Sequence, residues 1–183
     1  MMYIYVATRI ITYFGTETRV FFEQLVCRIF GIPQEDSRSF KMSEMCGHVE
    51  HELVTSLKQA FLICFLPFTV NFILGCCILL TGAYRVFYIG DYTFSSLLFA
   101  WVGISLLANC APSFENALSL KDYLYSKSTK GIVKILLSPF FAVYFACSFL
   151  ERYSVTLILA ILFAVGFPTI FGFAFPIINQ ILN

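Results

Sequence analysis

The chain has 183 residues, of which 59% are hydrophobic and only 13% charged, and its formal net charge is +1. A mean hydropathy of +0.82 and 22 phenylalanines lie far outside the range of soluble globular proteins. The near-zero net charge excludes the basic character of a nucleic-acid-binding domain, so we expect no nucleic-acid partner. Apolar runs of about twenty residues recur, each long enough to cross a ~30 Å hydrocarbon core as a helix. Composition therefore predicts an integral membrane protein.

The first thirty residues predict two embedded helical pieces. Residues 3–14 are apolar apart from Arg9, and Gly15 interrupts the pattern. Thr16 is placed to cap a second helix that runs to about Phe30, where a Gly-Ile-Pro triplet ends it. Whether the first fourteen residues cross the membrane is left open by the sequence.

Four further apolar segments follow a polar stretch at 34–56, which we expect to lie outside the membrane. The segments cover residues 56–80, 93–111, 132–150 and 154–179, with a short loop predicted at 81–92. We therefore expect an all-α, polytopic helical bundle with five to six membrane-embedded helices. It would form one membrane domain over residues 1–183, with N-terminal embedded helices in 1–31, a cytoplasmic loop in 32–56 and the bundle in 57–183.

The distribution of lysine and arginine predicts the orientation of this bundle. If every clear span crosses once, loops 32–58 and 111–134 lie on one side of the membrane. The basic residues of those two loops are Arg38, Lys41, Lys58, Lys121, Lys127, Lys130 and Lys134, whereas the opposite loops hold Arg85 and Arg152. We therefore expect the basic loops and the C-terminus to be cytoplasmic, in contact with membrane lipids.

Polar side chains within apolar segments are costly and face a protein interior or a cavity. The candidates here are Arg19, Glu23, Asn71, Ser105, Asn109, Glu115 and Asn116. Arg19 and Glu23 are one helical turn apart, so they can form an ion pair. The plainer alternative is that both charges lie near a membrane interface and reach toward water. Asn71 follows Pro67 by one turn and is suited to bond neighbouring backbone groups.

The polar segment contains a second candidate, CGHVEHE, in which His48 and His51 stand three residues apart. On a helix, this spacing supplies two metal ligands, and Cys46 offers a third. No second cluster accompanies it, so a solvated loop with two ordinary histidines is the interpretation we favour.

Several blocks in order resemble a small prokaryotic-type branch of the site-2-protease-like intramembrane zinc metalloproteases. That branch has P-G-T-x-x-H-E-x-x-H-x-x-x-C, then G-Y-V-x-H-E, then A-x-L-I-x-x-x-P-F-x-V-N, followed by W-L-G-I-S and P-S-x-x-D-A. This chain reads YFGTETRVFFEQLVC, CGHVEHE, QAFLICFLPFTVN and WVGISLLANCAPSFENA. The resemblance runs from about Tyr13 to Ala117, more than half of the chain, and implies the fold of that family.

The departures from the family pattern fall on the residues that carry its chemistry. Arg19 and Glu23 stand where the resemblance implies the first two zinc-binding histidines, and Val20 stands where it implies the general base. Asn116 replaces the aspartate that would be the third ligand. A hydrolytic zinc site needs about three protein ligands and an open position for water. Arginine stays protonated and cannot be a ligand, so we expect no metal and no cofactor. His51 matches a family position that is not a zinc ligand.

The resemblance therefore implies a catalytically inactive metalloprotease-like protein, in which an Arg19–Glu23 ion pair, bridged or flanked by Asn116, fills the place of the zinc. Such a protein would bind a partner transmembrane helix as a regulatory or structural subunit of a membrane complex. One alternative is an active zinc metalloprotease with displaced ligands, drawn from Glu23, His48, His51 and Glu115. Another is a transporter or channel component with a polar path lined by Arg19, Glu23, Asn71 and Asn109. Asn71, Ser105, Asn109 and Glu115 are the residues expected to line a polar pocket.

Overall fold

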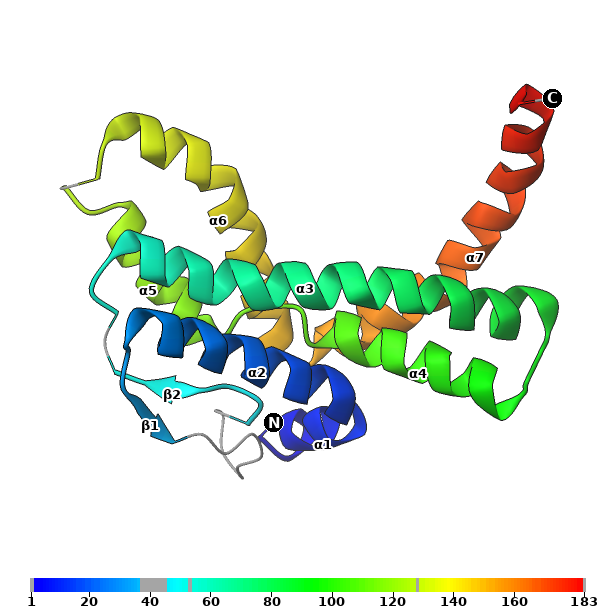
Figure 1. The fold of residues 1–183 in the computed structure, drawn as a ribbon, viewed down its shortest axis with the longest axis horizontal. Coiled ribbons are helices and arrows are strands. Elements are labelled where there is room, and N and C mark those ends of the chain that lie inside the picture. The colour runs from blue at the N-terminus through cyan, green and yellow to red at the C-terminus, as the bar shows by residue number, and fades with distance from the viewer. Residues whose placement is uncertain (1, 37–45, 53, 128, 183) are drawn as a thin grey trace.

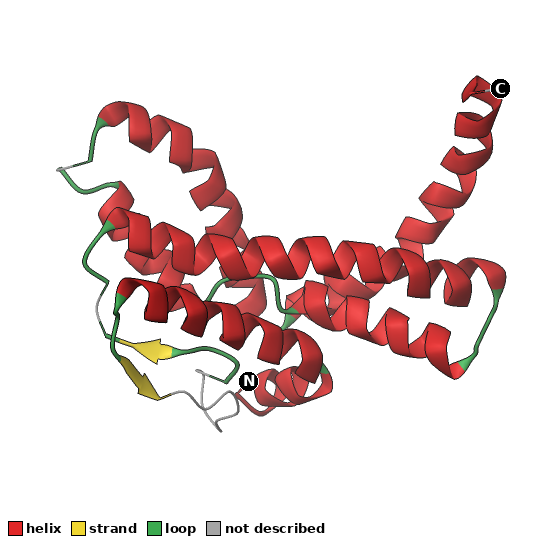
Figure 2. Cartoon of the chain, in the orientation of Figure 1, coloured by secondary structure: helices red, strands yellow, loops and turns green. Residues whose placement is uncertain are grey.

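The computed structural model describes residues 2–36, 46–52, 54–127 and 129–182. Its elements are α1 (Met2–Ile11), α2 (Tyr13–Phe30), β1 (Gln34–Asp36), β2 (Glu50–His51), α3 (Leu57–Ala83), the π-helical segment η1 (Tyr84–Ile89), α4 (Phe94–Ala108), α5 (Phe114–Leu124), α6 (Gly131–Arg152) and α7 (Val155–Leu182). The two short strands pair in antiparallel fashion, and helices make up most of the rest (Figure 2). The predicted helical architecture is confirmed.

Two helices in the described part of the chain are long and apolar enough to cross a membrane, judged by length and composition. They are Leu57–Ile89, which joins α3 to η1, and Gly131–Arg152, which is α6. Phe94–Ala108 and Val155–Pro168 are apolar but shorter. The ten residues of α1 give a helix about 15 Å long, too short to cross alone. Five to six embedded helices therefore stay a prediction.

The long helix α3 is the axis of the molecule, with α2 beside its first half and α4 beside its second half (Figure 1). Glycines set the close approach of α4 to α3. A Cβ atom on Gly82 would lie 2.2 Å from the backbone nitrogen of Ala100, and one on Gly103 would lie 2.8 Å from the Cα atom of Leu79. Small residues at these crossings let the two backbones touch, as in packed membrane helices.

Two predicted element boundaries are wrong. Gly15 does not interrupt the helix, because α2 begins at Tyr13 and Thr16 lies inside it. Gly15 is instead a packing position, since a Cβ atom there would lie 2.0 Å from the carbonyl oxygen of Ser105 in α4. The loop predicted at 81–92 is largely helical, because α3 continues through η1 until Gly90, whose φ of 76° ends it.

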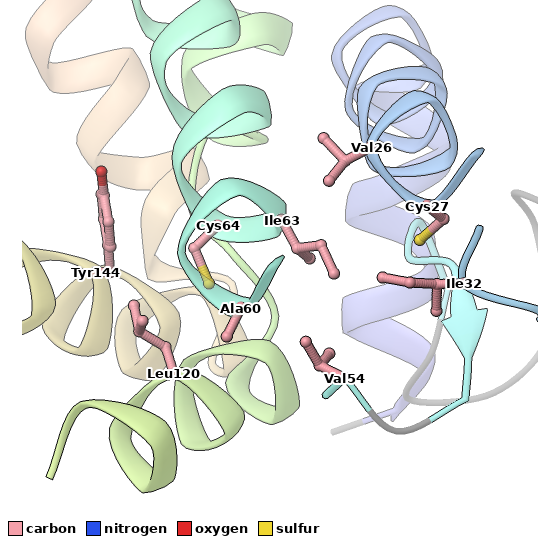
Figure 3. Close-up of a cluster of buried hydrophobic side chains, with 9 residues drawn as sticks. All are labelled: Val26, Cys27, Ile32, Val54, Ala60, Ile63, Cys64, Leu120 and Tyr144. Carbon is pink, nitrogen blue, oxygen red and sulfur yellow. The ribbon is translucent and has the colours of Figure 1, made fainter. Parts of the chain in front are cut away.

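One end of the bundle is closed by a hydrophobic cluster (Figure 3). It joins α2, the segment after it, α3, α5 and α6 through Val26, Cys27, Ile32, Val54, Ala60, Ile63, Cys64, Leu120 and Tyr144. The hydroxyl of Tyr123 also donates to the carbonyl of Val54, which ties the end of α5 to the chain just before α3. The polar segment and the α5 region, far apart in sequence, therefore meet at this end.

Substituting Gly82 tests the contact between α3 and α4. Gly82→Ala places a methyl group against the backbone of Ala100, so we expect a loss of about 1–3 kcal/mol through overpacking. The midpoint of thermal unfolding in detergent measures this loss. Gly131→Ala is the matched control, because no atom lies within 4 Å of a Cβ there. Equal midpoints for the two variants would contradict the packing described.

Candidate functional site

Helices α1 and α2 bury most of their polar side chains and expose most of their large apolar ones. The buried face of the two helices carries Tyr5, Thr8, Arg9, Thr12, Thr16, Arg19 and Glu23. Large apolar side chains are exposed on the other face: Tyr3, Ile4, Ile10, Ile11, Phe14, Phe21, Leu25 and Ile29. A helix on a water-soluble protein exposes far fewer large apolar side chains and buries fewer charges, so this arrangement gathers charge in the interior.

Arg19 and Glu23 form the ion pair expected from their spacing. The Nε atom of Arg19 donates to Oε1 of Glu23 at 3.2 Å, and the two side chains are 0% and 1% exposed. Such burial excludes the alternative in which both charges reach the water at an interface. Glu23 uses its second oxygen to accept the backbone N–H of Val49 at 3.0 Å, so the loop before β2 is fixed to α2.

Glu151, in the last turn of α6, is the centre of the buried charges. Its Oε1 atom accepts the Tyr5 hydroxyl at 2.9 Å and Nη1 of Arg19 at 3.3 Å, and it forms an ion pair with Nη2 of Arg9. The charges of two arginines and two glutamates thus balance, and each side chain is at most 3% exposed. A buried charge that is paired avoids most of the penalty of leaving water alone.

His48 fills the space between the two glutamates. Its Nε2 atom lies 3.1 Å from the Tyr5 hydroxyl and 3.2 Å from Oε1 of Glu151, and its Nδ1 atom lies 3.6 Å from Oε1 of Glu23. Burial, and next the charge of Arg19, lower the pKa of His48 to about 3. The ring is therefore neutral at physiological pH and leaves the charge balance of the cluster unchanged.

A second polar group joins α2 to the end of α4. Asn109 accepts from Arg9 and from the hydroxyl of Thr16, and its amide donates to the carbonyl of Ser105 at 2.7 Å. Ser105 in turn accepts the backbone N–H of Gly15 at 2.8 Å.

Asn71 completes this group from α3. Its amide donates to the carbonyls of Gly15 at 3.2 Å and Asn109 at 3.0 Å, which satisfies backbone groups as its position predicted. Asn71, Ser105 and Asn109 are each 0% exposed, so these three expected pocket residues do come together. They form a buried polar contact between α2, α3 and the end of α4.

Asn116 and Glu115 do not join the buried charges. Asn116 lies in the first turn of α5, where its side-chain oxygen accepts from Nε2 of His51 at 3.1 Å and its backbone N–H is capped by Ser113. Among the described residues, Asn116 bonds neither Arg19 nor Glu23, so the expectation that it bridges the pair is wrong. Glu115 is exposed, because it lies on the outer face of α5, and so it is not a pocket residue.

In the described part of the chain, the residues that align with the zinc ligands of the resembled family do not form a metal site. No group of three or more His, Cys, Asp or Glu side chains is placed there to share an ion. His48 and His51 turn to different partners, Glu151 and Asn116, which separates the two histidines considered as ligands. The solvated loop favoured from the sequence is wrong for His48, which is 2% exposed. Val20 is buried at 2% and offers no donor.

Sequence reasoning missed Tyr5, Arg9 and Glu151. Arg9 carried a signal, as the one charge in an otherwise apolar run. Glu151 carried less, because it lies at the end of α6 beside Arg152 and reads as part of a polar turn. Only the fold shows that α6 ends beside α1. Tyr5 and Glu151, which share a hydrogen bond there, are 146 positions apart in the sequence.

Removing the charge of Glu151 should destabilise the protein more than any surface change. Glu151→Gln leaves Arg9 and Arg19 with one carboxylate between them, and breaking a buried ion pair costs about 3–5 kcal/mol. We expect the thermal midpoint to fall by about 6–12 °C or more. Glu115→Gln is the matched control, with a shift below about 2 °C, since Glu115 is exposed. Similar midpoints for both variants would show that Glu151 does not hold the network.

The neutral state of His48 predicts a dependence of stability on pH. The pKa of His48 in the folded chain lies below that of a histidine in the unfolded chain. As pH falls below about 6.5, His48 is therefore protonated in the unfolded chain but stays neutral in the folded one. This contribution to stability is full above about pH 6.5 and decreases by up to about 1.4 kcal/mol per pH unit below it. Between pH 6.5 and 5.0 we expect a loss of about 2 kcal/mol.

The matched variants His48→Gln and His51→Gln separate this contribution from other titrating groups. His48→Gln should lose the part of the pH dependence that His48 supplies, whereas His51→Gln should keep it. Denaturant midpoints at pH 6.5 and 5.0 give the comparison. If both variants changed with pH as the unsubstituted chain does, His48 would not be the buried neutral group.

No protein-family model, no curated protein and no solved structure matches this chain. The description of the buried charge cluster therefore depends on its geometry alone. The likeness to site-2-protease-like enzymes stays a hypothesis based on the sequence blocks.

Proposed function

We propose that this chain is an integral membrane protein that works without catalysis, as a subunit that binds a partner transmembrane helix. The observation that carries the proposal is the closed, charge-balanced cluster of Arg9, Arg19, Glu23 and Glu151. Its carboxylates are already occupied by arginines, and both arginines would repel a metal cation. The cluster would hold the helices together in the place where the family that the sequence resembles holds zinc.

The outward apolar faces of α1 and α2 support a membrane location. Ile4, Phe21 and Ile29 are each more than half exposed, although the same helices bury two arginines. In water this arrangement would expose apolar surface and desolvate charge, both at a cost. In a bilayer, lipid covers the apolar face and the charges avoid the hydrocarbon.

The proposed topology places β2 and the segment just before α3 on the same side of the membrane as α5 and the start of α6. Two contacts support this: His51 bonds Asn116, and Tyr123 bonds the carbonyl of Val54. Both join the segment before α3 to α5. As predicted from the lysine distribution, we propose that this side is cytoplasmic.

Helix α6 is the proposed contact for the partner helix. Of the two candidate spans it is the less covered by its own chain. In its most apolar stretch 11% of the residues are buried, whereas 33% are buried in the corresponding stretch of α3 with η1. Exposed along it are Ile132, Ile135, Leu136, Phe140, Val143 and Phe149. Its last turn is anchored through Glu151, so the exposed face has a fixed orientation.

Site-specific photo-crosslinking in native membranes tests the proposal. A benzoylphenylalanine in place of Val143, which is 50% exposed on α6, should give a discrete protein adduct of defined mass. The control is the same probe in place of Tyr92, which is 71% exposed between η1 and α4, and it should not give that adduct. A probe at Val143 that yields only lipid adducts would overturn the proposal of a partner helix.

Zinc content separates the proposal from the metalloprotease with displaced ligands. Elemental analysis of protein purified without chelator should give well below one zinc per chain. A thermal midpoint that is unchanged by a chelator should accompany it, since a structural metal raises stability by binding. One zinc per chain, lost together with stability on chelation, would favour the metalloprotease.

A further inference from the structure

Four helix ends carry basic side chains to the same end of the molecule. Arg28 lies in the last turn of α2, Lys58 in the first turn of α3 and Lys121 in the last turn of α5. Lys130 is the residue just before α6, and Lys127 lies three residues earlier. Figure 1 shows the end of α2, the start of α3, the end of α5 and the start of α6 at one extremity.

Direct contacts show that these ends are neighbours. The Nζ atom of Lys58 lies 5.7 Å from the centre of the Phe30 ring, which places the start of α3 at the end of α2. Tyr123 bonds Val54, and the hydroxyl of Tyr125 lies 3.2 Å from the hydroxyl of Ser138 in α6. The basic residues therefore lie on neighbouring helix ends, although they come from positions 28 to 134 of the sequence.

We define this surface, the basic end, by Arg28, Lys58, Lys121, Lys127, Lys130 and Lys134. All are exposed except Lys134, which is half-buried, and none of them forms an ion pair within the described residues. Glu52 and Asp122 are exposed acidic side chains near it. At the far end of α3, by contrast, the charge of Arg85 interacts with that of Asp91. Positive charge is therefore concentrated at the basic end.

We propose that the basic end binds the anionic lipid headgroups of the leaflet that surrounds it. Both candidate spans begin there, at Leu57 and Gly131, so its lysines lie where a span leaves the hydrocarbon. Charges spread across four helix ends fit a plane of headgroups, and juxtamembrane lysines attract anionic lipid additively. This inference rests on the proposed membrane location and adds the chemical class of lipid.

Competition between lipids measures the preference directly. The full chain in neutral detergent is titrated with a fluorescent phosphatidylglycerol, and unlabelled phosphatidylglycerol or phosphatidylcholine is used as competitor. We expect phosphatidylglycerol to bind at least tenfold more tightly at low salt, and the preference to shrink as salt screens it. Equal affinities for the two lipids would overturn the proposal.

A quadruple variant assigns the preference to the basic end. Lys58, Lys121, Lys127 and Lys130 are exposed, so their replacement by Gln should leave the thermal midpoint unchanged and reduce the lipid preference to within twofold. Arg85→Gln, at the opposite end, should keep the preference. If the quadruple variant does not fold, Lys121→Gln with Lys127→Gln should still reduce the preference at least threefold. A preference that survives these changes overturns the proposal.

Two further outcomes have distinct meanings. If the chain resists alkaline carbonate extraction but binds both lipids equally, the membrane location stands and the lipid inference fails. If carbonate releases the chain, the membrane location fails and the lipid inference fails with it. Tight binding of a duplex DNA probe that is lost in the quadruple variant would also overturn the inference, in favour of a nucleic-acid partner.

Discussion

The fold depends on the pairing of two buried arginines with two buried glutamates. Arg19 and Glu23 belong to one helix, but Glu151 comes from the end of α6, and Arg9 comes from α1. Each of these charges alone would be strongly unfavourable in the interior. Because Glu151 pairs with both arginines, it holds the end of α6 beside α1 and α2.

The cluster also determines where the other elements lie. His48 brings the loop before β2 between the glutamates, and the backbone N–H of Val49 fixes it. Asn109 connects Arg9 to the end of α4, and Asn71 connects that end to the middle of α3. The polar interior is therefore one connected network, and large apolar side chains are exposed around it.

Part of this arrangement could be predicted from the sequence. The spacing of Arg19 and Glu23 on one helix face predicted their contact, because local geometry alone decides it. Asn71 was predicted to bond backbone groups for the same reason. The prediction that Asn116 bridges the ion pair and the prediction that Glu115 lines a pocket were wrong, since both depended on how α5 packs against the rest of the chain. Arg9 and Glu151 were missed because their pairing requires α1 and α6 to meet. Gly15 was misread as a helix break, since a glycine needed for close helix packing gives the same local signal.

A double-substitution cycle on Arg19 and Glu23 tests the central claim most directly, because it measures their coupling within the network. Replacing either residue by Leu leaves the buried cluster with one excess charge, whereas replacing both leaves Arg9 and Glu151 balanced. The account predicts that the double variant is more stable than the sum of the single losses implies, with a coupling of about 2 kcal/mol or more. Strictly additive losses would show that the two side chains do not stabilise each other, and would contradict a fold held by buried ion pairs.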